Sequence, residues 1–167
     1  MRYRLDVVSS SVADAVRFAG GWLFDRVMAG WDVTVLVGDP LNDRPLQVLG
    51  TRTLDLETAL RSMGARPQPQ SLAVAADLFG SDPRVRDGVL DALDHGATEV
   101  TLWGATESAE LDGSVDAVHH RLSGAARVFK AQALAAVAPG ASVAPIETFR
   151  SAMMLRRSVA ADLTPAS

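Results

Sequence analysis

The sequence predicts an α/β protein in which helices cover both faces of a mostly parallel sheet of four to five strands, a Rossmann-like three-layer sandwich. Apolar runs of strand length alternate with stretches whose apolar residues recur at helical spacing. The run at residues 31–39 (WDVTVLVGD) is apolar over most of its length, which is typical of a central parallel strand buried on both faces. Such strands need crossover connections, and the predicted helices supply them.

The N-terminal elements follow from spacing and capping. Residues 3–8 predict the first strand, and Ser11 then stands at the N-cap of a helix over residues 12–29. The pair Gly20 and Gly21 lowers the helix propensity of that segment by roughly 1 kcal/mol for each glycine. We therefore expect a compensating close approach between this helix backbone and the sheet.

The middle of the chain continues the alternation. Residues 46–50 (LQVLG) predict a strand, residues 55–63 a helix, and residues 65–70 (ARPQPQ) a polyproline-like connector. Residues 71–79 (SLAVAADLF) fit either a strand or a helix. We favour a strand over residues 72–76, because two consecutive helices would break the alternation.

The last predicted elements of the main domain are a helix, a strand and a long helix. Asp82 followed by proline starts a helix that Gly96 ends. Residues 98–104 alternate polar and apolar, which predicts a half-exposed strand near a sheet edge. Residues 114–137 predict the long helix.

The composition changes beyond this helix. We expect residues 1–138 to form a single α/β domain, followed over 139–167 by a linker, a short amphipathic segment and a flexible tail. The amphipathic segment, IETFRSAMMLRRSV at residues 146–159, predicts a short helix.

Composition excludes several classes of function. The 167 residues contain no cysteine, which removes disulfides, thiol catalysis and cysteine-bound metals. A net charge of −4 without a basic block argues against nucleic-acid binding. The chain has no apolar run long enough for a membrane span, and its N-terminus is too charged for a signal peptide, so we expect a cytoplasmic protein without membrane association.

The loops after the predicted strands are the candidate ligand site, because ligands of such sheets bind beyond the carboxyl ends of the strands. The candidate ligand-binding residues are Ser9, Ser10, Ser11, Gly38, Asp39, Gly104 and Thr106. A small anionic ligand would suit a helix N-terminus here. The alternative is purely structural: Ser11 caps the helix, and Asp39 with its following proline makes a turn. The glycine fingerprints of dinucleotide-binding and P-loop proteins are missing.

No catalytic or metal-binding motif stands out in the sequence, so we assign no catalytic residue, no metal site and no cofactor. His95 falls in the last turn of a predicted helix, where a cation complements the helix dipole. Asp112, Asp116 and His120 have helical spacing, but a solvated helix face explains them more simply than a metal site.

Several apolar side chains exceed the needs of the predicted core and form a candidate interface, namely Phe18, Trp22, Phe149, Met153 and Met154. Either a second layer of the same fold covers Phe18 and Trp22, or a partner does. With no catalytic motif, the sequence favours a non-enzymatic interaction or oligomerisation module with a protein partner or self-association. The alternative is a binding protein or enzyme for a nucleotide or other anionic small molecule, with its site at the carboxyl ends of the strands.

Overall fold

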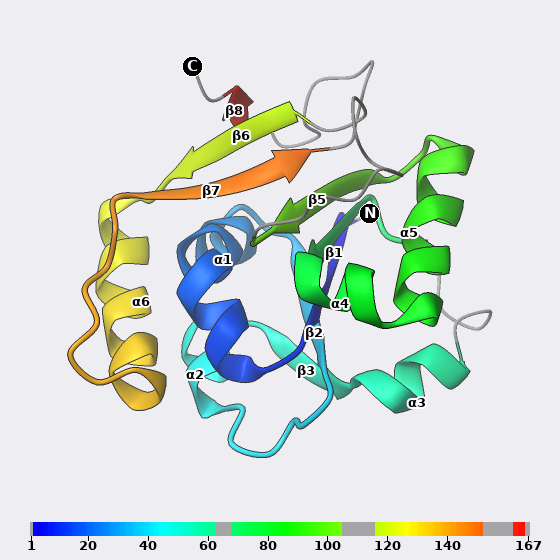
Figure 1. Ribbon diagram of the computed structural model, residues 1–167. Helices are drawn as coiled ribbons and strands as arrows, with labels where there is room; N and C mark the ends of the chain where they lie inside the picture. The colour runs from blue at the N-terminus through cyan, green and yellow to red at the C-terminus, as the bar shows by residue number, and fades with distance from the viewer. Residues whose placement is uncertain (1, 63–67, 105–115, 152–161, 166–167) are drawn as a thin grey trace.

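The computed structural model describes residues 2–62, 68–104, 116–151 and 162–165, and these form one mixed eight-stranded sheet with helices on both faces (Figure 1). The elements in chain order are β1 (Arg4–Ser9), α1 (Val12–Met28), β2 (Asp32–Val37), α2 (Arg44–Val48), β3 (Arg52–Asp55), α3 (Leu56–Arg61), β4 (Ser71–Ala75), α4 (Ala76–Ser81), α5 (Pro83–His95), β5 (Glu99–Trp103), β6 (Asp116–Arg121), α6 (Gly124–Val137), β7 (Ile146–Ser151) and β8 (Thr164–Pro165).

The strand order is β3-β2-β1-β4-β5-β7-β6-β8. The first five strands in this order are parallel, whereas β7, β6 and β8 pair antiparallel. The α/β class is therefore confirmed, but a mostly parallel sheet of four to five strands is wrong. The chain builds outward from β1 to β3 and then returns to place β4 on the other side of β1. The switch in strand order thus lies between β1 and β4.

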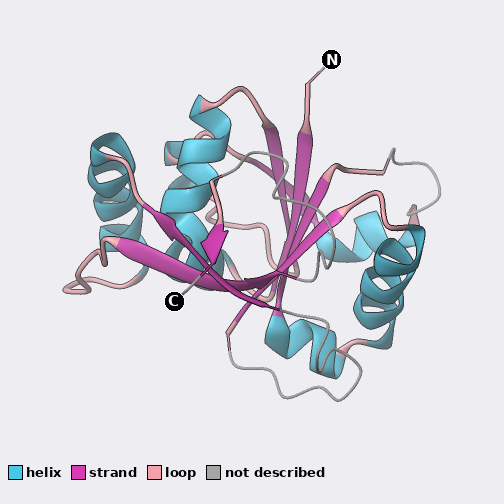
Figure 2. Cartoon of the chain, turned by 90° about the horizontal axis from the view of Figure 1, so that it is seen from above, coloured by secondary structure: helices cyan, strands magenta, loops and turns pink. Residues whose placement is uncertain are grey.

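The two faces of the sheet carry separate apolar cores. Helices α1, α2 and α6 cover one face, and α3, α4 and α5 cover the other (Figure 2). Successive strand residues point to opposite faces. In β1, accordingly, Val7 lies in the first core and Val8 in the second.

Capping residues and short sequence patterns predicted several elements correctly. The Ser11 hydroxyl accepts a hydrogen bond from the Asp14 amide and caps α1. The expected strand over residues 72–76 is β4, shifted by one residue. Asp82 caps α5, proline follows, and Gly96 ends the helix in the left-handed conformation with φ of 66°.

Two expected strands differ from the structure. Residues 46–50 fall largely in helix α2, where Leu46 and Leu49 are fully buried at helical spacing, and the strand β3 follows it instead. The strand expected near a sheet edge is β5, whose residues are all buried. It is central because β7 pairs with the side that we expected to be open.

The C-terminal third differs most from the expectation. The helix expected over residues 114–137 begins only at Gly124, and residues 116–121 form strand β6. The segment expected to form an amphipathic helix contributes strand β7 over its described part. The division of the chain after residue 138 stays a prediction, although β7 lies between β5 and β6 of the same sheet. No helix among the described residues is long and apolar enough to cross a membrane.

Candidate functional site

The turn from β1 into α1 lies beside the switch in strand order, and its three serines bond within the turn. The Ser9 hydroxyl donates to the Ser11 carbonyl at 2.8 Å, and the Ser10 hydroxyl donates to Asp14 Oδ2 at 3.0 Å. Ser11 is the N-cap. Ser9 is fully buried, whereas Ser10, Ser11 and Asp14 are half-buried at the start of the helix. The structural role expected for Ser11 is confirmed, and Ser10 with Asp14 forms a half-buried polar pair.

The loop after β2 lies beside this turn, and the loop after β5 lies beside the start of α4. A Cβ atom built on Gly38 would lie 4.0 Å from the Ser10 carbonyl oxygen, so the loops after β1 and β2 are neighbours. Asp39 is exposed and accepts from the Leu41 amide at 3.2 Å, which is the turn expected for it. Gly104, after β5, lies close to Ala76, the first residue of α4. Thr106 lies outside the described residues.

The sequence analysis missed Asp77 at this edge. Asp77 is exposed in the first turn of α4, directly after β4. Its position after an apolar strand was the available signal, but the helix or strand ambiguity of residues 71–79 hid it. Asp14, Asp39 and Asp77 therefore all follow parallel strands, and the carboxyl edge around β1 and β4 is acidic.

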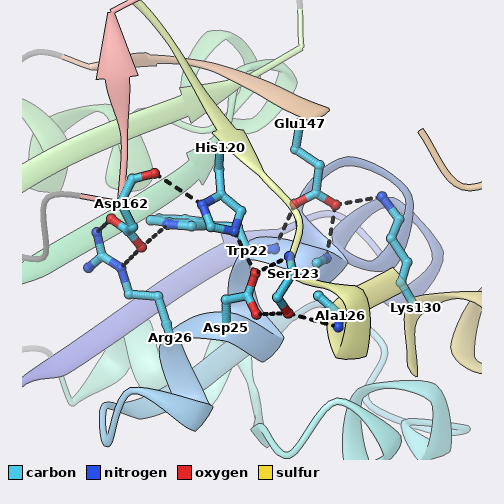
Figure 3. A network of polar contacts seen from close by, with 10 residues as sticks. Trp22, Asp25, Arg26, His120, Ser123, Ala126, Lys130, Glu147 and Asp162 are labelled. Carbon is cyan, nitrogen blue, oxygen red and sulfur yellow. Dashed lines mark hydrogen bonds and ion pairs between the residues drawn. The ribbon is translucent and has the colours of Figure 1, made fainter. Parts of the chain in front are cut away.

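A second polar region is buried between α1, α6 and the antiparallel strands (Figure 3). The guanidinium of Arg26 is fully buried and binds Asp162 through Nε at 2.7 Å and through Nη2 at 2.8 Å. Nη2 also contacts Glu99 at 3.1 Å, and the indole rings of Trp22 and Trp31 lie 4.8 and 4.2 Å from the guanidinium carbon.

The carboxylate of Glu147 contacts the interior of α1. It accepts from the amides of Gly21 at 2.9 Å and Trp22 at 2.7 Å, and it pairs with Lys130 Nζ at 2.5 Å (Figure 3). Lys130 also donates to the carbonyl of Arg17 at 2.8 Å. A buried ion pair from α6 and β7 therefore meets the α1 backbone where its two glycines lie.

The close approach expected at the glycine pair involves helices α2 and α6 as well as the sheet. A Cβ atom on Gly21 would lie 2.3 Å from the Leu122 side chain, whereas one on Gly20 would lie 3.4 Å from Leu49 and Lys130. The helix backbone thus approaches Lys130 of α6, Leu49 at the end of α2, and Leu122, which lies two residues before α6. The sheet also contacts this backbone, through the Glu147 carboxylate of β7, which accepts from the Gly21 amide at 2.9 Å.

Among the described residues, the histidines belong to no metal-binding group. His119 and His120 lie on strand β6 and not on a helix, so the expected helical spacing with Asp116 is absent, and Asp112 lies outside the described residues. His120 is buried, with Nε2 at 2.7 Å from Asp25 Oδ2 and Nδ1 at 3.0 Å from the Asp162 carbonyl (Figure 3). Over the described ranges, no group of three or more histidine, aspartate or glutamate residues could hold a metal ion.

His95 occupies the place expected for it, in the last turn of α5. Its Nδ1 lies 2.8 Å from the Asp91 carbonyl, and this hydrogen bond, together with the charge of Asp91, raises the pKa of the imidazole above its usual value. Sequence position and structure agree on a role at the helix end.

The described candidate interface residues, Phe18, Trp22 and Phe149, do not share one surface. Trp22 is fully buried and packs on Phe149, with ring centroids 5.0 Å apart, so a layer of the same fold covers it. Phe18 is 40% exposed on the outer side of α1. Met153 and Met154 lie outside the described residues. Self-association or a protein partner stays a prediction.

Comparison with known proteins finds the fold among deacetylases. The A40926 pseudoaglycone deacetylase Dbv21 is similar with a TM-score of 0.60 and 19% identity over 93% of this chain and 100% of that chain. The deacetylase–teicoplanin complex has a TM-score of 0.61 and 16% identity over 89% of this chain and 98% of that one. The zinc-inhibited form of teicoplanin deacetylase Orf2 has a TM-score of 0.59 and 15% identity over 89% of this chain and 97% of that chain.

No protein-family model and no curated protein matches the sequence. The structural similarity shows the fold. Because these structures with the same fold are enzymes, the expectation of a non-enzymatic interaction or oligomerisation module is wrong. The alternative, a small-molecule site at the carboxyl ends of the strands, agrees better with these neighbours.

Proposed function

We propose that this protein is an enzyme that removes an acyl group from a small molecule, with its site at the carboxyl ends of β1, β2 and β4. The observation that carries the proposal is the switch in strand order between β1 and β4, beside which the turn into α1 presents Ser10 and Asp14. Crevices at such switch points are where open α/β sheets bind ligands. The deacetylases that share the fold support the choice of reaction.

Asp14 is the residue we assign as the general base. Its carboxylate is half-buried and is oriented by the hydrogen bond from the Ser10 hydroxyl. In the proposed step Asp14 takes a proton from water while the water oxygen attacks the acyl carbonyl carbon. The bond from that carbon to the leaving nitrogen or oxygen then breaks, and the leaving group takes up the proton. The products are a carboxylic acid and the free amine or alcohol.

The N-terminus of α1 supports the same reaction electrostatically. This helix is 17 residues long, and its N-terminal amides carry a partial positive charge at the edge where the carbonyl oxygen becomes negative. The acidic side chains of Asp39, in the loop after β2, and Asp77, in the first turn of α4, favour a substrate whose leaving amine or sugar hydroxyls can donate hydrogen bonds.

The test is release of acetate from a panel of small N-acetyl amides and O-acetyl esters, including acetylated sugars, followed by mass spectrometry. We expect Asp14→Asn to lower kcat/KM by roughly a hundredfold or more, as loss of a general base does. Asp87→Asn is the matched control, because Asp87 is exposed on α5. Equal rates for the two variants would remove Asp14 from the reaction, and no turnover with any acyl donor would overturn the proposal.

Ligand binding at the same turn can be measured separately from the reaction. A ligand at about 100 times its Kd raises the free energy of unfolding by roughly 2.7 kcal/mol, which thermal denaturation detects. Ser11→Arg would place a long cationic side chain at the N-cap and should abolish the shift. A shift with nucleotides and none with acylated compounds would move the substrate class to nucleotides.

A further inference from the structure

A pocket of about 200 Å³ lies on the face of the sheet opposite α1, between helices α3 and α5. Its floor is formed by strand residues of the second core, among them Val8, Leu36 and Val74. Ala59 of α3 and Val89 of α5 line facing walls. Figure 2 shows the sheet between the two groups of helices, so this pocket is separated by the sheet from the polar network of α1 and α6.

The lining is suited to an apolar ligand. The floor and wall residues just named are at most 7% exposed, and all of them are aliphatic. Water gains few hydrogen bonds against this aliphatic floor and these walls, whereas an apolar molecule there would remove more of their surface from water. An apolar cavity of about 150 Å³ is large enough to hold benzene. The volume here therefore suffices for an alkyl or aryl group somewhat larger than benzene.

Charged groups at the rim are already paired. Arg84 of α5 reaches Glu57 of α3 with two hydrogen bonds of 2.8 and 2.9 Å, and it also binds Asp82 at 3.0 Å. This pairing holds the pKa of Glu57 and of Asp82 below the usual values and ties the two helices together.

The two acidic residues of the lining also lie beside basic side chains. Asp6 lies 3.5 Å from Arg4, and Asp91 lies 3.6 Å from His95. A charged ligand would have to give up hydration without gaining a counterion that is not already engaged. The rim thus selects against both carboxylates and ammonium groups.

We propose that this pocket is a binding site for a small uncharged apolar molecule, an alkyl or aryl group between benzene and indole in size. The site is separate from the proposed acyl-transfer edge, and its occupancy does not depend on that reaction. Helices α3 and α5, held together by Arg84 and Glu57, form its walls and should move little on binding.

The experiment compares three probes of equal chain length, hexan-1-ol, hexanoate and hexylamine, by NMR titration of the whole chain. We expect hexan-1-ol to bind with a Kd of about 1 mM, within reach of the per-atom limits for small ligands. Both charged probes should bind at least tenfold more weakly. Intermolecular NOEs from hexan-1-ol should reach the methyl groups of Leu56, Val85 and Val89.

A substitution that fills the pocket provides a second test of the proposal. Ala92→Phe adds a phenyl group to the α5 wall and should weaken hexan-1-ol binding at least tenfold, whereas Ala135→Phe on the exposed side of α6 should leave it unchanged. If Ala92→Phe does not fold, the intermolecular NOEs measured on the unmodified chain show whether hexan-1-ol binds in this pocket. Equal binding of the three probes, NOEs to other parts of the chain, or no binding at millimolar concentration would each overturn the proposal.

Discussion

Arg26 of α1 and Asp162 form a two-pronged ion pair that joins the first helix to the segment before β8, with Nε–Oδ2 and Nη2–Oδ1 distances of 2.7 and 2.8 Å. Glu99 of β5 shares the same guanidinium, and the rings of Trp22 and Trp31 contact it. One cation therefore compensates two carboxylates from distant parts of the chain. The pairing stabilises this arrangement only while all three charges are present.

Arg26→Met should destabilise the fold by about 3–5 kcal/mol, because it leaves Glu99 and Asp162 without their shared cation. Urea unfolding measures the change. Arg2→Met is the matched control, since Arg2 pairs with Asp32 at 3.2 Å on the surface, where ion pairs contribute only about 0–1 kcal/mol. Equal losses in the two variants would show that the buried ion pair contributes no more than an exposed one.

Lys130 and Glu147 should show strong coupling in a double-mutant cycle. Lys130→Met alone leaves a buried carboxylate and should cost about 3–5 kcal/mol. Glu147→Gln alone should also destabilise, because an amide offers one acceptor oxygen to two α1 amides and none of the charge that Lys130 needs.

The double variant should lose less than the sum of the single variants, with an interaction energy of about 0.5–3 kcal/mol. Urea denaturation of the four proteins gives the cycle. Additive losses would mean that each residue contributes to stability through its α1 contacts and that the pair itself contributes nothing.

Predictions from the sequence were accurate where neighbouring residues determine the structure. Ser11 and Asp82 were identified as caps and Gly96 as a helix end, because capping depends on residues within one turn. The segment at 46–50 was misassigned because its two buried leucines fit a helix as well as a strand.

The C-terminal strands could not be predicted in the same way. Strand β7 is set by its pairing with β5 and β6, and Glu147 on it bonds to amides 125 and 126 residues away. No pattern of neighbouring residues in the sequence indicates partners that lie so far away along the chain. The carboxyl-edge loops were located from the alternation of elements. The pocket was missed because Ala59 and Val89 come together only when α3 and α5 pack on the sheet.

Gly20→Ala and Gly21→Ala should have opposite effects although the residues are adjacent. At Gly21 the added methyl would lie 2.3 Å from the Leu122 side chain, and such overpacking costs about 1–3 kcal/mol. At Gly20 the nearest atoms are 3.4 Å away, so the gain in helix propensity, up to about 1 kcal/mol, should dominate.

Thermal unfolding of both variants is the measurement, with the wild-type chain as reference. A loss for Gly20→Ala as large as that for Gly21→Ala would show that α1 cannot shift at either position. A gain for Gly21→Ala would show that Leu122 moves aside at little cost.

His95 should make the stability depend on pH in one direction. Its pKa is raised first by the hydrogen bond to the Asp91 carbonyl and then by the Asp91 charge, so the folded state binds the proton more tightly than the unfolded state. The stabilisation is fully present below the unfolded pKa of about 6.5 and is lost as the pH rises through the folded pKa.

His95→Gln should therefore lower the urea midpoint more at pH 5 than at pH 9, by a small amount because the side chain is 59% exposed. Asp91→Asn keeps the carbonyl that accepts the bond and removes only the charge, so it should reduce the pH dependence in part. If Asp91→Asn removes the whole effect, the charge is the main cause and the hydrogen bond at 2.8 Å contributes little.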